Sequence, residues 1–262
     1  MQYSVSRDEI RDEICPQKKN SMNRFCGFPK DLACAAVFAV FILSASIVFV
    51  LCFRPLFYLD IPLFQLEKEA GLPAETIRNN YDKLIGYLML WNRKPLTLPD
   101  FQMSESGRIH FSDCKKIFDL VQILFLLSGA VLFARGMILK SRKETKRQVS
   151  GEIGFKEGMQ RIHGRPLYSS RCLFITGFLL TGIPAVIGIY ALLDWEKLFV
   201  SFHRLFFSND YWLFDPATDP MILILPDGFF FQCLAVILVM VIGSGLICIA
   251  RAIKIRKVDK YG

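Results

Sequence analysis

Four long apolar stretches constrain the fold of this chain more than any other feature of its sequence. They cover residues 32–53, 117–139, 172–193 and 228–250. Each is about the 20 residues long that an α-helix needs to cross the hydrocarbon core of a membrane. A helix satisfies its backbone hydrogen bonds within one segment, which lipid requires of any spanning structure. The sequence therefore predicts an all-α polytopic membrane protein with four transmembrane helices.

The overall composition excludes an ordinary water-soluble domain. Of the 262 residues, 53% are hydrophobic and 24 are phenylalanine, and the mean hydropathy is positive, which is too apolar for a soluble domain of this size. Residues 1–31 form a polar tail before the first apolar stretch, and no small-residue cleavage pattern follows that stretch. We therefore expect residues 32–53 to be a retained spanning helix and not a signal peptide.

Basic residues are divided unequally among the segments between the stretches. Residues 140–171 hold nine Lys/Arg and three Asp/Glu, and residues 251–262 hold five and one. Residues 54–116 hold nine and eight, and residues 194–227 hold two and six. Because Lys and Arg favour the cytoplasmic side, both termini and residues 140–171 are expected in the cytoplasm, and the other two segments outside. The net charge of +8 is then a topology and lipid-headgroup signal, and no nucleic-acid partner is expected.

Residues 54–116 are long enough to form a small extracytoplasmic cap. After Pro73, apolar residues recur at helical spacing and predict an amphipathic helix: Ile77, Tyr81, Leu84, Ile85 and Leu88. This helix is expected either to lie on the membrane interface or to pack against the rest of the cap. Residues 101–103 and 108–110 are possible short strands around the turn between them.

Two of the three histidines lie in the predicted outer segments. They are His110 and His203, whereas His163 lies in the basic cytoplasmic segment. Imidazole is suited to proton transfer near neutral pH. In a helix, Asp113 would share a face with His110 and could orient it, or it could pair with Lys116 instead.

His203 stands among apolar residues beside Arg204. Burial there would favour the neutral, base-competent imidazole, although a histidine among aromatic residues is often only packed. Asp215 and Asp219 flank Pro216 and either line a polar pocket, orient a histidine, bind a cation or shape turns.

Cysteine and glycine patterns give further limits. Of the eight cysteines only Cys114 falls in an outer segment, so no internal disulfide is expected there, and no spacing typical of a zinc site occurs. Phosphate-binding, dinucleotide-binding and metalloprotease motifs are missing from the sequence. We therefore expect neither a cofactor nor a metal. Gly243 and Gly245 are expected to allow close helix packing.

Three stretches carry a resemblance to a known family. They are SESGRIHFSDCKKIFDL at 104–120, FHRLFFSNDYWLFDPATDPMILILPDGFF at 202–230 and YDKLIGYL at 81–88. In these stretches, in their spacing and in the order of four helices, the chain resembles the bacterial lipoprotein intramolecular transacylase family, over about residues 32–250.

The resemblance implies an acyl transfer at the outer face of the membrane. The sn-2 acyl chain of a diacylglyceryl-modified N-terminal cysteine would move to the α-amino group of that cysteine, giving a lyso-form lipoprotein. The family's two functional histidines match His110 and His203, and we take the supporting residues to be Asp113, Arg204, Asn209, Tyr211, Trp212, Asp215 and Asp219. The expected partners are diacylglyceryl-modified lipoproteins and membrane lipids.

Which histidine accepts the proton stays open from the sequence. Two alternatives to this activity also stay open. One is a non-enzymatic membrane module that binds a partner through its outer segments. The other is a metal-dependent membrane hydrolase that uses His110, His203, Asp215 and Asp219.

Overall fold

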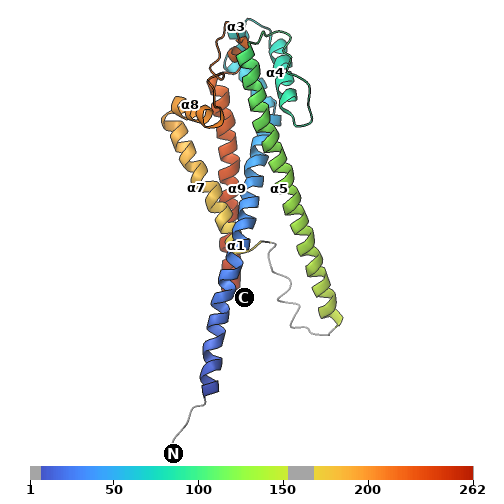
Figure 1. Cartoon of the computed structure of the whole chain (residues 1–262), viewed down its shortest axis with the longest axis vertical. Coiled ribbons are helices and arrows are strands. Elements are labelled where there is room, and N and C mark those ends of the chain that lie inside the picture. Colours follow the sequence, from blue (N-terminus) through green and yellow to red (C-terminus); the bar gives the residue numbers. More distant parts are fainter. Residues whose placement is uncertain (1–6, 153–167, 262) are drawn as a thin grey trace, which may run out of the picture.

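The computed structural model describes residues 7–152 and 168–261, in which four long helices form a bundle (Figure 1). These helices are α1 (Arg7–Cys52), α5 (Glu105–Glu152), α7 (Ser170–Leu193) and α9 (Asp227–Tyr261). Each contains a stretch long and apolar enough to cross a membrane. The predicted all-α architecture with four spanning helices is confirmed. His163 and the middle of the predicted basic loop lie outside the described residues.

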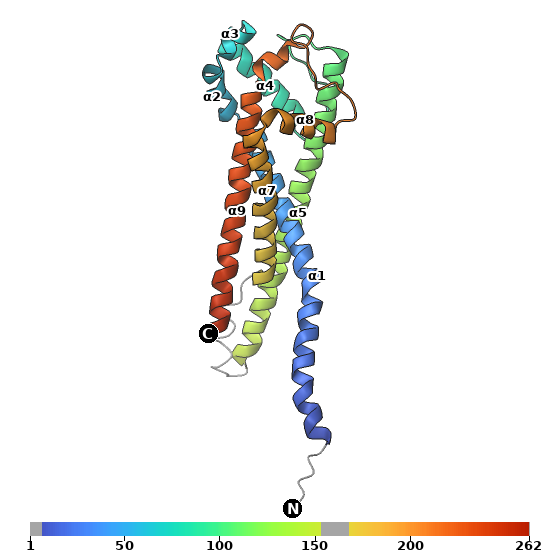
Figure 2. The ribbon, with the colours of Figure 1, turned by 90° about the vertical axis from the view of Figure 1, so that its left-hand side faces the viewer.

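Among the described residues, five short elements lie between the long helices. They are α2 (Pro55–Leu63), α3 (Leu66–Ala70), α4 (Ala74–Leu88), α8 (Trp195–Phe206) and the 3₁₀ turn η1 (Pro220–Ile224). Figures 1 and 2 show α2, α3, α4 and α8 at the end of the bundle opposite the C-terminus. The name cap is used below for α2, α3, α4, η1 and the loops that join them.

Small residues bring α7 and α9 together. A Cβ on Gly177 would lie 2.7 Å from the carbonyl oxygen of Gly245, and a Cβ on Gly245 would lie 2.8 Å from Cγ2 of Thr181. Both distances are too short for a side chain, so glycine at these positions permits the close approach that membrane helices use in place of hydrophobic collapse. The packing role predicted for Gly245 is confirmed, whereas Gly243 has open space beside it.

The cap has its own apolar core. The rings of Phe57 and Tyr81 stack with centroids 3.7 Å apart, and Phe229 at the start of α9 meets both edge-on. Met221 and Ile224 of η1 are buried in the same cluster. The cap is therefore continuous with the upper ends of α5 and α9 and holds them in fixed positions.

The structure decides between two alternatives for the cap and corrects one expectation. The helix predicted from residues 77 to 88 exists as α4, and Ile77, Tyr81 and Leu84 are buried against the rest of the cap, so the alternative of packing within the cap is the one that the structure has. The short strands at 101–103 and 108–110 are wrong: no strand occurs among the described residues, and residues 108–110 are already helical in α5. Ser104 starts that helix earlier than the apolar pattern indicated.

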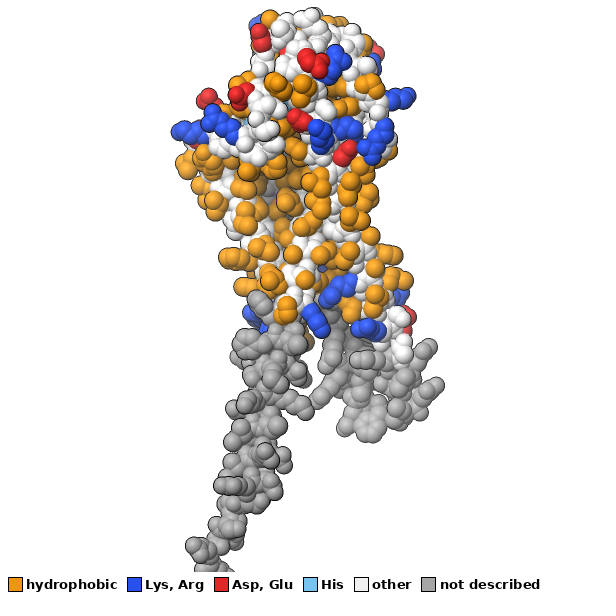
Figure 3. Space-filling model, in the orientation of Figure 1, with side chains coloured by type: hydrophobic (Ala, Val, Ile, Leu, Met, Phe, Trp, Pro, Cys, Tyr) orange, Lys and Arg blue, Asp and Glu red, His pale blue; other side chains and the backbone are white. Residues whose placement is uncertain are grey.

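The surface of the bundle is apolar along its middle. Figure 3 shows hydrophobic side chains over the long helices and charged side chains gathered at the cap and at the opposite end. Large apolar side chains are exposed on three of these helices, with Phe133 at 73%, Val186 at 67% and Val239 at 73%. Such a belt is stable in hydrocarbon and not in water.

Candidate active site

The first histidine lies near the start of α5, where a side-chain hydrogen bond stabilises the first turn of the helix. The hydroxyl oxygen of Ser104 accepts a hydrogen bond of 2.9 Å from the backbone N–H of Gly107. This satisfies one of the amides that have no partner inside a helix at its start. His110 follows Gly107 on the same helix and is buried, with 6% of its surface exposed. The hydrogen bond from Gly107 to Ser104 thereby fixes the helical turn that carries His110.

Asp219 fastens the segment after α8 to the same helix start. Its Oδ1 accepts a hydrogen bond of 2.8 Å from the backbone N–H of Ser104. Its Oδ2 accepts one of 2.9 Å from the hydroxyl of Thr218. A Cβ on Gly107 would overlap the Asp219 carboxylate and lie 3.2 Å from the ring of Phe214. Glycine at position 107 therefore permits this contact, which we call the Asp219 latch.

The second histidine lies on α8. Asp194 caps this helix by accepting a hydrogen bond of 3.0 Å from the backbone N–H of Lys197. Nδ1 of His203 lies 2.8 Å from the carbonyl oxygen of Phe199, one turn earlier. Burial lowers the pKa of His203 below its ordinary 6.5, whereas the hydrogen bond to Phe199 and the charge of Asp227 act in the opposite direction. The neutral imidazole is favoured.

The fold brings His110 and His203 together, and we call them the histidine pair. Their ring centroids are 6.1 Å apart. The ring of Phe207 contacts both, at 4.7 Å from His110 and 5.6 Å from His203. Trp212 stacks on His203 at 4.7 Å, and Phe214 meets His110 edge-on at 5.3 Å. Aromatic rings from α8 and the loop after it thus enclose two imidazoles.

The ring nitrogens of the histidine pair are not equivalent. A carbonyl oxygen only accepts hydrogen bonds, so Nδ1 of His203 carries a proton and donates it to Phe199. In its neutral form His203 then has an unprotonated Nε2. Nε2 of His110 lies 3.4 Å from Sγ of Cys114, and its Nδ1 is buried without a hydrogen-bond partner in the described part of the chain. Such a pair can accept a proton at one ring and hold a polar group at the other.

A family model decides the kind of protein. The model of the lipoprotein intramolecular transacylase Lit matches residues 32–230. The chain belongs to the lipoprotein intramolecular transacylase family. It is therefore an enzyme, an acyltransferase whose family acts on lipoproteins. The family predicted from the sequence is confirmed, and the alternative of a non-enzymatic module is wrong.

Solved structures of one family member share the fold of this transacylase. One is the in meso structure of the membrane integral lipoprotein intramolecular transacylase Lit from Bacillus cereus, 28% identical, with a TM-score of 0.73 over 93% of this chain and 100% of the other. Two more are of the same protein with one histidine replaced. The arginine variant is 25% identical, with a TM-score of 0.69 over 94% and 98% of the two chains. The alanine variant is 27% identical, with a TM-score of 0.69 over 94% and 99%.

The likeness in fold extends over nearly the whole chain, and this transacylase is an integral membrane protein. No curated protein is similar enough in sequence to match it.

Asp113 of the transacylase does not bond to His110. It shares a face of α5 with that histidine, as predicted, but its Oδ1 pairs with Nζ of Lys116 at 2.8 Å. The alternative that Asp113 forms an ion pair on its own helix is what the structure has. Burial lowers the pKa of His110 to about 4, and the charge of His203 acts in the same direction, whereas the charge of Asp113 acts against both.

The loop after α8 places the other predicted residues around the histidine pair in different ways. Asn209 and Asp215 shape turns, since each accepts a hydrogen bond from the backbone N–H two residues ahead. Arg204 and Tyr211 are exposed, whereas Trp212 is buried against His203. Of the predicted supporting residues, Trp212 alone has a ring contact with the histidine pair among the described contacts.

The structure does not gather the predicted metal ligands. Asp219 is engaged by Ser104 and Thr218, and Asp215 is exposed in a turn. Among residues 7–152 and 168–261, no group of three or more His, Cys, Asp or Glu side chains could hold a metal ion. The residue set His110, His203, Asp215 and Asp219 thus lacks the convergence that a metal site needs.

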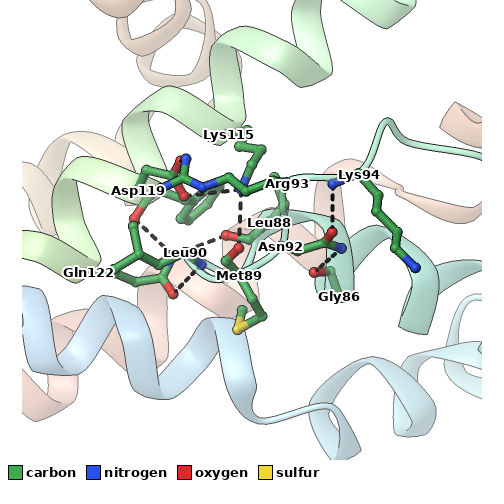
Figure 4. Close-up of polar contacts among 11 residues, drawn as sticks. Gly86, Leu88, Met89, Leu90, Asn92, Arg93, Lys94, Lys115, Asp119 and Gln122 are labelled. Atoms are coloured by element: carbon green, nitrogen blue, oxygen red, sulfur yellow. Dashed lines mark hydrogen bonds and ion pairs between the residues drawn. The ribbon is translucent and has the colours of Figure 1, made fainter.

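Sequence reasoning missed a polar clamp on the part of α5 that follows His110, shown in Figure 4. Gln122 is buried, with Nε2 donating to the carbonyl of Leu88 at 3.0 Å and Oε1 accepting from the N–H of Leu90 at 3.1 Å. Lys115 donates to the carbonyl of Met89 and pairs with Asp119, each at 3.1 Å. These side chains fasten the end of α4 to α5. The signal was present, because Asp119 and Gln122 interrupt the apolar stretch at 117–139 and follow Lys115 at helical spacing.

Proposed function

We propose that this transacylase moves the sn-2 acyl chain of a diacylglyceryl-modified N-terminal cysteine to the α-amino group of the same cysteine. The product is a lyso-form lipoprotein. The observation that carries this proposal is the histidine pair, whose ring centroids lie 6.1 Å apart although the two residues belong to different outer segments of the sequence. Amine and ester lie on one substrate molecule, so attack within that molecule can be worth roughly 7 to 11 kcal/mol. An enzyme nucleophile is not needed.

His203 is assigned as the general base. Its Nδ1–H is committed to the carbonyl of Phe199, which leaves Nε2 to accept a proton. Burial keeps the pKa of His203 below 6.5, so the ring is neutral near pH 7. The amine nitrogen attacks the ester carbonyl carbon and gives its proton to Nε2 of His203. The tetrahedral intermediate then breaks its bond to the glyceryl oxygen.

His110 is assigned as the group that serves the leaving oxygen. The glyceryl oxygen becomes negatively charged as its bond to the acyl carbon breaks, and the N–H of a neutral imidazole can stabilise it with a hydrogen bond. The sulfur of Cys114 lies at Nε2 of His110, so Nδ1 is the nitrogen left for the substrate. The proton that His203 took from the amine passes to the glyceryl oxygen, so both histidines end the reaction neutral.

The reaction is proposed for the outer face of the membrane, with both termini in the cytoplasm. The support is the division of Lys and Arg between the segments, with residues 140–171 and 251–262 strongly basic. Helix α8, which carries His203, lies at the same end of the bundle as the cap, opposite the C-terminus (Figure 2). Membrane lipids are proposed to surround the apolar belt, and nucleic acid is not expected as a partner.

The test measures the acylation of a reporter lipoprotein by mass spectrometry of its N-terminal peptide. Cells that contain the full chain are expected to give the N-acylated lyso-form. We expect His203→Ala and His110→Ala to lower its rate of formation by a factor on the order of 10² to 10⁴ each, which is the range for one acid or base step. His163→Ala is the matched control and is expected to be fully active. A normal yield of the lyso-form from the double variant would refute the assignment.

A further inference from the structure

The indole of Trp212 presents a hydrogen-bond donor that the fold does not use. The side chain is buried, with 9% of the residue exposed. Its Nε1 is enclosed and has no hydrogen-bond partner in the described part of the chain. An indole N–H gains a partner in water, so burying it unpaired destabilises the fold. Such a donor is free to bond to a ligand.

The location of this donor connects it to the proposed base. The indole ring stacks on the imidazole of His203, with centroids 4.7 Å apart and planes inclined by 28°. The backbone on both sides of Trp212 is held by turns, in which Asn209 accepts from the N–H of Tyr211 at 3.1 Å and Asp210 accepts from the N–H of Leu213 at 3.0 Å. The indole ring that carries the donor is thus fixed in position against the ring that would receive the amine proton.

We propose that the Trp212 indole N–H donates a hydrogen bond to the acyl carbonyl oxygen of the substrate as that oxygen becomes negatively charged. This inference rests on the proposed function. Attack by the amine nitrogen converts the ester carbonyl into a tetrahedral centre, and the electron pair of the C=O bond moves onto the oxygen. The pair returns when the bond to the glyceryl oxygen breaks. Trp212 forms no covalent bond and loses no proton.

Indole chemistry fits this task better than that of the other polar groups near the pair. The Nε1–H is a donor only, so it does not compete with His203 for the amine proton. A preorganised donor in a site that excludes water stabilises a developing oxyanion without reorganising at the moment of reaction. Buried Nδ1 of His110, also without a partner in the residues that the structure describes, lies on the other ring of the pair. Each of these unmatched groups then gains its partner when substrate binds.

The chain contains a matched control in Trp195. This residue also has a buried Nε1 without a partner among the described residues. Its ring contacts Phe199 at 5.9 Å and Phe231 at 5.3 Å, whereas no ring contact with a histidine is found for it in the described part of the chain. Removing the N–H of Trp195 therefore tests what an equivalent change does to packing alone.

The experiment compares Trp212→Phe with Trp195→Phe in the full chain in membranes, with a diacylglyceryl-modified lipopeptide as substrate. We expect Trp212→Phe to lower kcat by a factor of about 10² to 10³, the range for one lost oxyanion donor, and to change KM by less than about threefold. Trp195→Phe is expected to stay within about twofold of the parent kcat. Equal kcat values for the two variants would overturn the inference.

A second variant separates the N–H from ring shape. A tryptophan analogue with sulfur in place of the N–H, incorporated at position 212, keeps the bicyclic ring and its stacking on His203. It is expected to show the same loss of kcat as Trp212→Phe, and full activity would overturn the inference even if the phenylalanine variant folded poorly. His203→Ala measured beside it tests the proposed function separately, because loss there with a fully active analogue would remove only the role of Trp212.

Discussion

In each histidine of the pair, one neighbouring atom occupies one ring nitrogen and leaves the other available to substrate. For His203 that atom is the carbonyl oxygen of Phe199, one helical turn earlier. For His110 it is Sγ of Cys114, one turn later. Both contacts follow from spacing by four residues in a helix. They leave Nε2 of His203 and Nδ1 of His110 as the nitrogens available to substrate, so the local helix sets the proton chemistry.

This arrangement predicts the pH dependence of the rate. Because burial lowers the pKa of His203 below 6.5, its neutral form persists at pH values at which an ordinary histidine is protonated. The α-amino group of the substrate has an ordinary pKa of about 7.7–8.0, so kcat/KM is expected to fall first with protonation of that amine, and the further fall from protonation of His203 is expected only below pH 6.5. The measurement is a pH profile of the initial rate with a diacylglyceryl-modified lipopeptide. The profile of His163→Ala should overlay it, and a second protonation step centred between pH 6.5 and the step of the amine would contradict the assignment of His203 as base.

Sequence patterns could predict which residue types the site holds but not how the rings meet. Two histidines in outer segments followed from apolar stretches and charge alone. Their approach depends on α8 folding across the bundle and on aromatic contacts such as Phe207 with both rings. The contact of Phe207 with His110 joins residues about 100 positions apart, and no local propensity encodes a pairing of that range.

At the scale of elements, two fastenings orient the start of α5. The Asp219 latch ties the loop after α8 to the first turn of α5 through the N–H of Ser104. The clamp of Lys115, Asp119 and Gln122 ties α5 to the end of α4 (Figure 4). Removing one partner of a buried hydrogen bond or ion pair leaves the other unpaired, which destabilises the fold. Together they fix where α5 presents His110.

The Asp219 latch predicts a strong effect of one methyl group at position 107. In Gly107→Ala the new Cβ would overlap the Asp219 carboxylate, so the loop that carries Trp212 and Phe214 must shift. A misplacement of about 1 Å can lower a rate about 10²-fold, and we expect kcat to fall 10- to 100-fold, about that range. The matched control is Gly86→Ala, since nothing lies within 4 Å of a Cβ at Gly86.

The readouts for this pair are the lipopeptide initial rate and thermal unfolding in the same detergent. Gly86→Ala is expected to keep the parent rate, because its new Cβ meets no neighbour. It is not expected to lower the unfolding temperature, because helix interiors favour alanine over glycine. If Gly107→Ala keeps the parent rate as well, the latch does not position the site.

The elements themselves were predictable in proportion to how local their signals are. Long apolar stretches and the spacing of Ile77, Tyr81 and Leu84 predicted the long helices and α4. The strands expected at 101–103 and 108–110 failed because Ser104 caps α5 early. The sequence did not predict what the apolar face of α4 packs against, because that depends on tertiary contacts between segments distant in sequence.

At the scale of the whole molecule, the four helices and the cap define two ends with different charge. The cap end holds the histidine pair, and the opposite end carries the strongly basic residues 251–258 of α9. A membrane potential and anionic lipids favour keeping such a basic end in the cytoplasm. In the orientation proposed above, with the basic end in the cytoplasm, the histidine pair is at the outer face.

Single introduced cysteines test this orientation in intact cells. Trp91, 78% exposed in the loop after α4, and Val258, 61% exposed near the end of α9, lie at opposite ends of the molecule. We expect Trp91→Cys to react with a membrane-impermeant maleimide in intact cells and Val258→Cys to react only after permeabilisation, because the cap is proposed outside and the basic end inside. The parent chain gives the background from its own cysteines. Labelling in the reverse order would place the histidine pair in the cytoplasm and rule out the outer-face reaction.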